Sequence, residues 1–305
     1  MTTMAIRTEG LTKRYGATVA LNHLDLAVAP GEVVGYLGPN GAGKTTTIRL
    51  LLGLAQATEG RAEIFGLDCE RRPAEIHRRL AFVAGEANLW PSLTGEETLV
   101  LLGRVHGAVD GTYRGELIER FAFDPTKKVR AYSKGNRQKL ILIAALMTRP
   151  DLLVLDEPTS GLDPLMEQAF RLSIREARDR GQTIFLSSHI MGEVEALCDR
   201  IAILRNGALV EVGTLAEMRH LSALIVEVTF DGAVPELSRV PGVTVSEVVG
   251  PRVRCHVRGP IEPLLDVLAG TGVKVLLSRE PSLEELFLAQ YGTDEPVSPG
   301  PHDAS

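Results

Sequence analysis

The stretch Gly38-Pro-Asn-Gly-Ala-Gly-Lys44-Thr45 decides the fold, because it fits the pattern G-x-x-x-x-G-K-[ST] in full. An apolar strand is predicted before it, over residues 32–37, and a helix after it, from 44 to about 54. The glycines let the backbone turn so that N–H groups point at phosphate oxygens, and the new helix presents its positive end to the same anions. We expect a nucleoside triphosphate here, bound by Gly38, Pro39, Asn40, Gly41, Ala42, Gly43, Lys44, Thr45 and Thr46.

Two of these residues have distinct predicted roles. Lys44 is expected to reach the β- and γ-phosphates, and the Thr45 hydroxyl to bind Mg²⁺. The loop by itself indicates only a nucleoside triphosphate, since kinases, GTPases and motor proteins share it.

A second signal is an apolar strand that ends in two carboxylates, LLVLDE over residues 152–157. Asp156 is placed to hold Mg²⁺, and Glu157 to polarise the attacking water as general base. A strand that ends in acidic residues is common by chance. Here the segment PTSGLD follows directly, over residues 158–163.

Strand and helix patterns alternate along most of the chain, which predicts an α/β fold with a largely parallel, helix-covered sheet. Residues 74–150 have mainly helical patterns, a helix is expected over 164–180, and a strand over 183–186. Two apolar runs flank Asn206-Gly207, a dipeptide that favours a type I′ hairpin turn.

The pattern changes after about residue 220, so we expect domains over 1–219 and 220–291. Strand-like segments (223–230, 243–249, 252–257, 273–278) and helix-like segments (263–270, 282–290) predict a small α+β domain of the ferredoxin-like β-α-β-β-α-β type. Residues 292–305 are polar and rich in Pro and Gly, and are expected to be a disordered tail.

Composition limits the possible partners. The net charge of −6 argues against a general nucleic-acid-binding protein, which usually carries a basic face. Cys69, Cys198 and Cys255 lie far apart and are expected to be buried, reduced thiols. No apolar stretch approaches the length that spans a bilayer, so any membrane-spanning part is expected on another chain.

Taken together, these motifs resemble the ATP-binding-cassette (ABC) ATPases over about residues 5–219, with a helical subdomain at about 86–150. The string LLVLDEPTSGLD is similar to the family's sequence, and YSKGNRQ (132–138) is similar to its LSGGQ signature. The resemblance implies that Ser133 and Gly135 contact the γ-phosphate held by the other protomer. It also implies that His189, in SSH (187–189), contacts the γ-phosphate, and that Tyr15 stacks on adenine.

The chain departs from the family in two places. Gly85 stands where a glutamine usually contacts Mg²⁺ and the attacking water, and Glu86 follows it. We hypothesise that Glu86 contributes to the metal or water shell; the alternative is that it contacts only the partner or solvent. In the signature, Lys134 replaces glycine and either adds charge near the nucleotide or faces solvent, and Asn136 replaces glutamine.

The resemblance implies ATP and Mg²⁺ as ligands, a head-to-tail homodimer, and a separate transmembrane permease that docks near residues 85–110. The protein would then be cytoplasmic and peripheral on the inner face of the membrane. The C-terminal segment PSLEELFLAQYG (281–292) resembles ATPase subunits of drug and antibiotic exporters of the daunorubicin- and tetronasin-resistance type.

Export of a drug or antibiotic is therefore the first functional hypothesis. The second is an importer, or an exporter of lipid or polysaccharide. A soluble ABC protein of translation or DNA repair is disfavoured, since those usually have two cassettes or a long coiled-coil insertion. This chain has one set of motifs and no heptad run. The cargo is not encoded in these motifs.

Overall fold

The structure, a computed structural model, describes residues 3–85, 88–107, 109–220, 223–282 and 284–285. The chain forms two compact units, Met1–Thr214 and Leu215–Ser305. The predicted domain boundary at residue 219 lies inside helix α8 (Leu215–His220), which belongs to the second unit.

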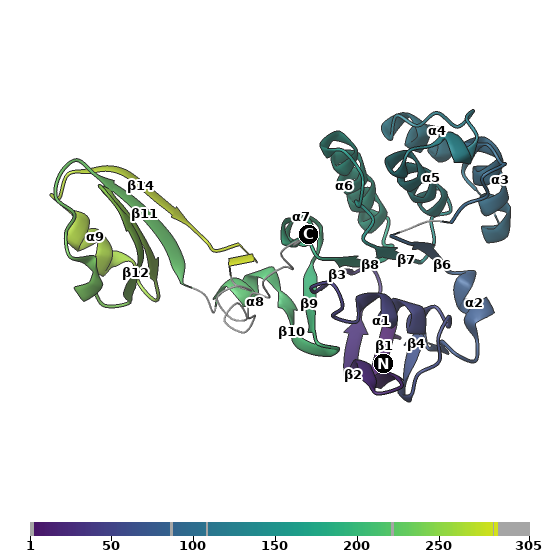
Figure 1. Cartoon of the computed structure of the whole chain (residues 1–305), viewed down its shortest axis with the longest axis horizontal. Helices are drawn as coiled ribbons and strands as arrows, with labels where there is room; N and C mark the ends of the chain where they lie inside the picture. Colours follow the sequence, from purple (N-terminus) through teal and green to yellow (C-terminus); the bar gives the residue numbers. More distant parts are fainter. Residues whose placement is uncertain (1–2, 86–87, 108, 221–222, 283, 286–305) are drawn as a thin grey trace, which may run out of the picture. The chain divides into compact units, whose positions relative to one another are not determined.

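A six-stranded sheet is the centre of the first unit (Figure 1). Its strand order is β10-β9-β3-β8-β7-β6, and only the β9–β10 pair is antiparallel. The strands are β3 (Val33–Leu37), β6 (Leu80–Val83), β7 (Leu152–Asp156), β8 (Thr183–Ser188), β9 (Arg200–Arg205) and β10 (Ala208–Thr214). The predicted α/β class with a mostly parallel sheet is confirmed.

A second, antiparallel sheet in this unit has the order β2-β1-β4-β5. Its strands are β1 (Ile6–Tyr15), β2 (Thr18–Val28), β4 (Glu59–Ile64) and β5 (Leu67–Asp68). The strands over residues 59–68 were not predicted from the sequence. Helix α1 (Lys44–Leu51) ends three residues before its predicted end, because Gly53 follows with a positive φ of 65°.

Helix α1 shares one hydrophobic core with both sheets. Ile48 and Leu51 of the helix belong to the same buried cluster as Leu11 of β1, Tyr36 of β3 and Val154 of β7. Packing on two sides holds the start of α1, and with it the phosphate loop, in one position.

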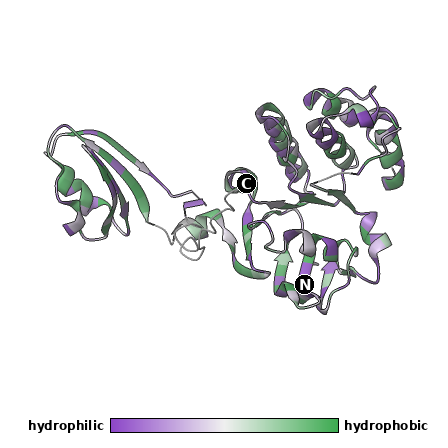
Figure 2. Cartoon of the chain, viewed as in Figure 1, coloured by the Kyte–Doolittle hydropathy of each residue, from purple (hydrophilic) through white to green (hydrophobic). Residues whose placement is uncertain are grey.

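The helices α3 (Gly95–His106), α4 (Gly111–Arg120) and α5 (Lys134–Leu146) gather at one end of the first unit (Figure 1). Their starts are well capped: Thr94 and Glu97 form a capping box, Asp110 caps α4 and Ser133 caps α5. The remaining helices are α2 (Pro73–His77), α6 (Pro164–Asp179), α7 (Met191–Leu197) and the 3₁₀ turn η1 (Val129–Ala131). Hydrophobic and hydrophilic residues are interspersed along α3 and α6, as expected for helices with one buried face (Figure 2), whereas the second half of α5 is hydrophobic and buried.

The second unit contains an antiparallel sheet of order β12-β13-β11-β14. Its elements are β11 (Leu224–Phe230), β12 (Val243–Val249), β13 (Arg252–Val257), α9 (Glu262–Leu268), β14 (Val273–Arg279) and the 3₁₀ turn η2 (Leu237–Arg239). Between β11 and β12, where the predicted pattern requires a helix, the chain has only η2. The intervening segment DGAVPELSRVPG contains two prolines and two glycines, which oppose helix formation.

Part of the predicted C-terminal structure lies outside the described residues. This applies to the tail at 292–305 and to most of the helix expected over 282–290. Within the described residues, no helix is both long and apolar enough to cross a bilayer.

Candidate nucleotide-binding site

The predicted motifs meet at one edge of the six-stranded sheet. Strands β3, β8, β7 and β6 are parallel neighbours, so their carboxyl ends lie side by side. The phosphate loop follows β3, His189 follows β8, Glu157 follows β7 and Gly85 comes shortly after β6. This edge is where parallel α/β sheets bind ligands.

Lys44 folds over the phosphate loop. Its Nζ atom donates to the carbonyl oxygens of Gly38 at 2.6 Å and Pro39 at 3.2 Å, and the residue is only 6% exposed. Burial lowers the pKa of Lys44, and the nearby carboxylates Glu157 and Asp156 oppose that shift. The ammonium group therefore lies at the phosphate loop, where the phosphate oxygens of a bound nucleotide could accept its hydrogen bonds in place of these two carbonyl oxygens.

Gly43 allows the loop to take this shape. Its φ is 110°, and a Cβ atom there would lie 2.6 Å from the carbonyl oxygen of Ala20 on β2. Only glycine accepts both the backbone angle and this close approach. The loop is thereby pressed against the β1–β2 hairpin.

Tyr15 lies at the end of that hairpin, paired with Thr18. Its side chain is half exposed, at 48%, and the Lys13 ammonium lies 4.9 Å from the ring centroid. An exposed aromatic ring on this hairpin is free to stack on a base, which is its predicted role.

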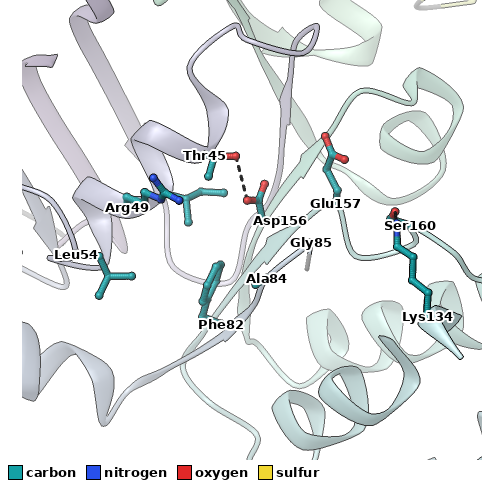
Figure 3. Close-up of a pocket in the computed structure, with 11 residues that line it drawn as sticks. Thr45, Arg49, Leu54, Phe82, Ala84, Gly85, Lys134, Asp156, Glu157 and Ser160 are labelled. Carbon is teal, nitrogen blue, oxygen red and sulfur yellow. Dashed lines mark hydrogen bonds between the residues drawn. The ribbon is translucent and has the colours of Figure 1, made fainter. Parts of the chain in front are cut away.

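Asp156 and Thr45 come together as the sequence predicted (Figure 3). The Thr45 hydroxyl donates to Asp156 Oδ2 at 3.2 Å, and the Ser187 hydroxyl donates to Oδ1 at 2.5 Å. Asp156 is 8% exposed. Ser187 comes from the next strand, β8, and its role in orienting Asp156 was not predicted.

The Asp156 and Thr45 oxygens suit Mg²⁺. This ion typically takes one or two protein oxygens and completes its shell with waters and substrate phosphates. No cluster of three or more His, Cys, Asp or Glu side chains able to hold a metal exists among the described residues. The donor set therefore fits an ion that arrives with a nucleotide better than a permanent all-protein metal site.

Glu157 lies between Lys44 and His189. Its Oε1 atom is 3.1 Å from His189 Nδ1 and 3.9 Å from Lys44 Nζ. The backbone φ of Glu157 is 47°, a left-handed conformation that costs a non-glycine residue about 1–3 kcal/mol and often marks functional sites. A carboxylate between a cation and an imidazole is well placed to act as a general base.

Ser133 and Gly135 are not brought to the phosphate loop of their own chain. In the part of the chain that the structure describes, the Ser133 hydroxyl accepts from Asn136 N at 3.3 Å, and no hydrogen bond joins it to that loop. A Cβ on Gly135 would lie 2.5 Å from the Gly161 carbonyl oxygen, so the start of α5 touches the loop after β7 directly.

The other residues of this helix start reinforce that contact. Lys134 Nζ donates to the Ser160 hydroxyl at 3.2 Å, and Gln138 Nε2 donates to the Pro158 carbonyl oxygen at 2.8 Å. Lys134 is exposed and also lies on the cavity that Thr45 and Asp156 line, so both sequence-based alternatives for it stay open.

A cavity of about 540 Å³ opens beside these groups (Figure 3). Thr45, Asp156, Glu157, Lys134 and Gly85 line it. A Cβ on Gly85 would lie 3.2 Å from the carbonyl oxygen of Asp156, so a side chain at this position would reach the predicted metal site. Glu86, the predicted substitute for the missing glutamine, lies outside the described residues.

This phosphate loop, this carboxylate pair and this switch histidine on one parallel sheet define an ATPase of the ABC type. Comparison with known proteins agrees, since residues 21–160 match the ABC transporter family. A solved ATP-binding subunit of an ABC transporter superposes with a TM-score of 0.67 at 31% identity, over 71% of this chain and 92% of that one. The dimeric bacterial ABC transporter cassette MJ0796 shares the fold, with a TM-score of 0.61.

Sequence relatives extend the match along the whole chain. The daunorubicin resistance ATP-binding protein of Streptomyces coeruleorubidus is 37% identical over 97% of this chain and 99% of its own length. The Nod factor export ATP-binding protein I of Bradyrhizobium diazoefficiens is 34% identical over 96% of this chain and 98% of its own length. The bacitracin transport ATP-binding protein of Bacillus licheniformis is 41% identical over 68% of each chain. The chain belongs to the ABC transporter ATP-binding proteins, a family of ATP hydrolases.

Proposed function

We propose that this subunit powers the export of a drug or antibiotic through a separate transmembrane permease. The end-to-end similarity to a daunorubicin resistance protein carries the proposal, because it includes the C-terminal unit as well as the ATPase. The bacitracin transport relative supports the same class of cargo. In this scheme the protein is cytoplasmic and binds the inner face of the membrane through its permease.

Export of another kind of cargo is the second candidate. The Nod factor export protein matches nearly the same share of the chain. These ATP-binding proteins are all similar to this chain but are named for different cargoes. We infer that the permease, rather than this subunit, selects the cargo. The proposal is tested by co-expressing this subunit with a membrane protein encoded by a neighbouring gene. The efflux of daunorubicin and of bacitracin from the cells is then measured. Equal retention of both drugs with and without the wild-type pair would contradict it.

A head-to-tail homodimer explains the location of the signature residues. Ser133 and Gly135 contact their own helix and the loop after β7, not their own phosphate loop. Ser133 caps α5, a helix of 13 residues whose first N–H groups can receive an anion. Each ATP would then lie between the phosphate loop of one protomer and the Ser133–Gly135 segment of the other.

Within each site the residues have separate tasks. Lys44 and the loop N–H groups bind the phosphates, while Thr45 and Asp156 hold Mg²⁺, which neutralises charge on the phosphate oxygens when bound. Glu157 accepts a proton from the attacking water. His189, held 3.1 Å from Glu157, orients that carboxylate and contacts the γ-phosphate.

Glu86 is proposed to complete the metal or water shell in place of the glutamine that Gly85 lacks. The position of Gly85, beside the Asp156 carbonyl, supports this proposal. Glu86→Ala is expected to lower the ATPase rate and to raise the Mg²⁺ concentration needed for half-maximal activity. Unchanged rate and Mg²⁺ dependence would leave Glu86 as a contact to the partner or solvent only.

Glu157→Gln tests the site as a whole. The amide keeps the shape of the side chain but cannot accept the proton, so we expect the turnover rate to fall by about 10²- to 10⁴-fold. Removing a negative charge near the γ-phosphate should preserve ATP binding. The variant is therefore expected to accumulate as an ATP-bound dimer, which gel filtration with and without ATP measures. A monomeric variant with wild-type turnover would contradict the scheme.

A further inference from the structure

The hydroxyl group of Ser188, the residue before His189, forms a hydrogen bond with the backbone of Ile190, the residue after it. The Ser188 Oγ atom accepts the Ile190 N–H at 2.9 Å, and it donates to Oε2 of Glu193 at 2.6 Å. Ser188 is the last residue of β8, whereas Glu193 lies in α7. The turn that carries His189 is therefore closed by a hydrogen bond whose other end is the Glu193 carboxyl group.

Glu193 is unusual for an acidic residue because it is almost completely buried, at 4% exposure. Its second oxygen, Oε1, is buried and has no hydrogen-bond partner among the described residues. Burial raises the pKa of Glu193, and the side chains of Ser188 and Thr159 both oppose part of that shift. A buried carboxyl with an unpaired oxygen is far less costly when it is protonated.

Glu193 lines a cavity shared with the catalytic groups. This cavity of about 240 Å³ is lined by Glu193, Ser188, Thr159, Glu157 and His189, among others. Glu193 is thus connected to His189 through the Ser188 turn and lies on the same cavity as Glu157.

We propose that Glu193 is a positioning residue for His189, and that its hydrogen bond with Ser188 closes the turn at 188–190 and holds the imidazole against Glu157. The inference rests on the proposed roles of His189 and Glu157 in hydrolysis. Glu193 itself touches neither nucleotide nor water nucleophile in this scheme. It acts by fixing the backbone at 188–190 and so the 3.1 Å approach of His189 to Glu157.

Titratable groups on neighbouring elements also act on the pKa of Glu193. Glu167 on α6 favours the neutral form, and Arg171 on the same helix opposes it. Cys198, just after α7, is also close, and its own raised pKa, caused mainly by burial, keeps the thiol neutral. Burial nevertheless decides the direction of the shift, because it is the largest of these effects on the pKa of Glu193.

The test compares Glu193→Gln, Glu193→Ala and the control Glu195→Gln in the full-length chain, each with and without His189→Ala. Steady-state ATPase activity is measured from pH 6 to 9 together with KM for ATP. Glutamine keeps the neutral, hydrogen-bonding shape of the protonated acid. We expect Glu193→Gln to retain kcat, because the amide oxygen can accept the same hydrogen bond from Ser188. Glu193→Ala should lower kcat about tenfold or more with KM within about twofold.

A residue that acts through His189 has nothing to position once the imidazole is removed. We therefore expect Glu193→Ala to cause no further loss in the His189→Ala background. Three results would each overturn the inference. They are a further loss of kcat in the double variant, a wild-type kcat in Glu193→Ala, and an equal loss of kcat in Glu193→Gln and Glu193→Ala. If Glu193→Ala does not fold, Glu193→Gln decides, because a tenfold loss of kcat in this variant, which keeps the acceptor for Ser188, overturns the inference. Wild-type activity in His189→Ala alone would instead refute the proposed site.

Discussion

The contact between Gly135 and Gly161 leads to a prediction with a defined size. In Gly135→Ala, the new Cβ would lie 2.5 Å from the Gly161 carbonyl oxygen, about 0.9 Å closer than ordinary van der Waals contact at 3.4 Å. Both atoms belong to backbone or backbone-fixed groups, so neither can rotate away. Overpacking of this kind typically costs about 1–3 kcal/mol. For a unit of this size, that corresponds to a fall in Tm of roughly 2–12 °C.

The same displacement should impair catalysis. A shift of about 1 Å in a positioned group can cost about 10²-fold in rate. We expect Gly135→Ala to lower ATPase activity by about that factor, because the segment from Ser133 to Gly135 would move relative to the loop after β7. Differential scanning calorimetry and a coupled ATPase assay measure the two effects.

Gly115→Ala is the matched control. Gly115 lies within α4, has no positive φ, and has no atom within 4 Å of a new Cβ. Alanine there should stabilise the protein by about 0.5–1 kcal/mol through helix propensity and leave activity unchanged. If Gly135→Ala matched Gly115→Ala in Tm and activity, the close approach at Gly161 would not exist in solution.

Two further predictions concern ATP binding and stability. Lys44→Ala should abolish detectable ATP binding in calorimetry while the fold persists. The substitution removes the cation at the phosphate loop, 2.6 Å from the Gly38 carbonyl oxygen, that is proposed to bind the phosphates. An affinity for ATP within tenfold of wild type would refute that role. Arg120→Ala should lower the free energy of unfolding in urea by about 2 kcal/mol, because it breaks a partly buried, two-pronged bond to Glu176 that joins α4 to α6. Arg171→Ala, which breaks an exposed pair within α6, is the control and should cost less than about 0.5 kcal/mol.

Local sequence signals predicted the features that depend on a few adjacent residues. The Asn206-Gly207 dipeptide predicted a hairpin, and both residues have positive φ angles, 49° and 77°. The helix expected over 164–180 is present as α6, which ends before Gly181. These elements follow from backbone sterics and capping within a few residues, which a single sequence displays directly.

Features that depend on distant segments were missed or incomplete. The strands at residues 59–68 have no strong apolar alternation and form because β1 offers an open edge to β4. Ser187 binds Asp156, and Lys134 binds Ser160, only because β7, β8 and α5 pack side by side. A polar residue that ends a buried strand was the available signal for Ser187, but its partner depends on the order of strands in the sheet.

The sequence by itself determined the phosphate-binding loop, the Asp156–Glu157 pair and the class of ATPase, because these reside in short motifs whose chemistry is local. Tertiary structure decided which groups meet. Strand order brings His189 to Glu157 and Thr45 to Asp156, and it leaves Ser133 away from its own phosphate loop. It also buries Glu193 behind the His189 turn. Such contacts arise from the packing of strands and helices far apart in the chain. The motifs predicted that Thr45 and Asp156 serve one metal ion, but they gave no sign of the bond between Ser188 and Glu193.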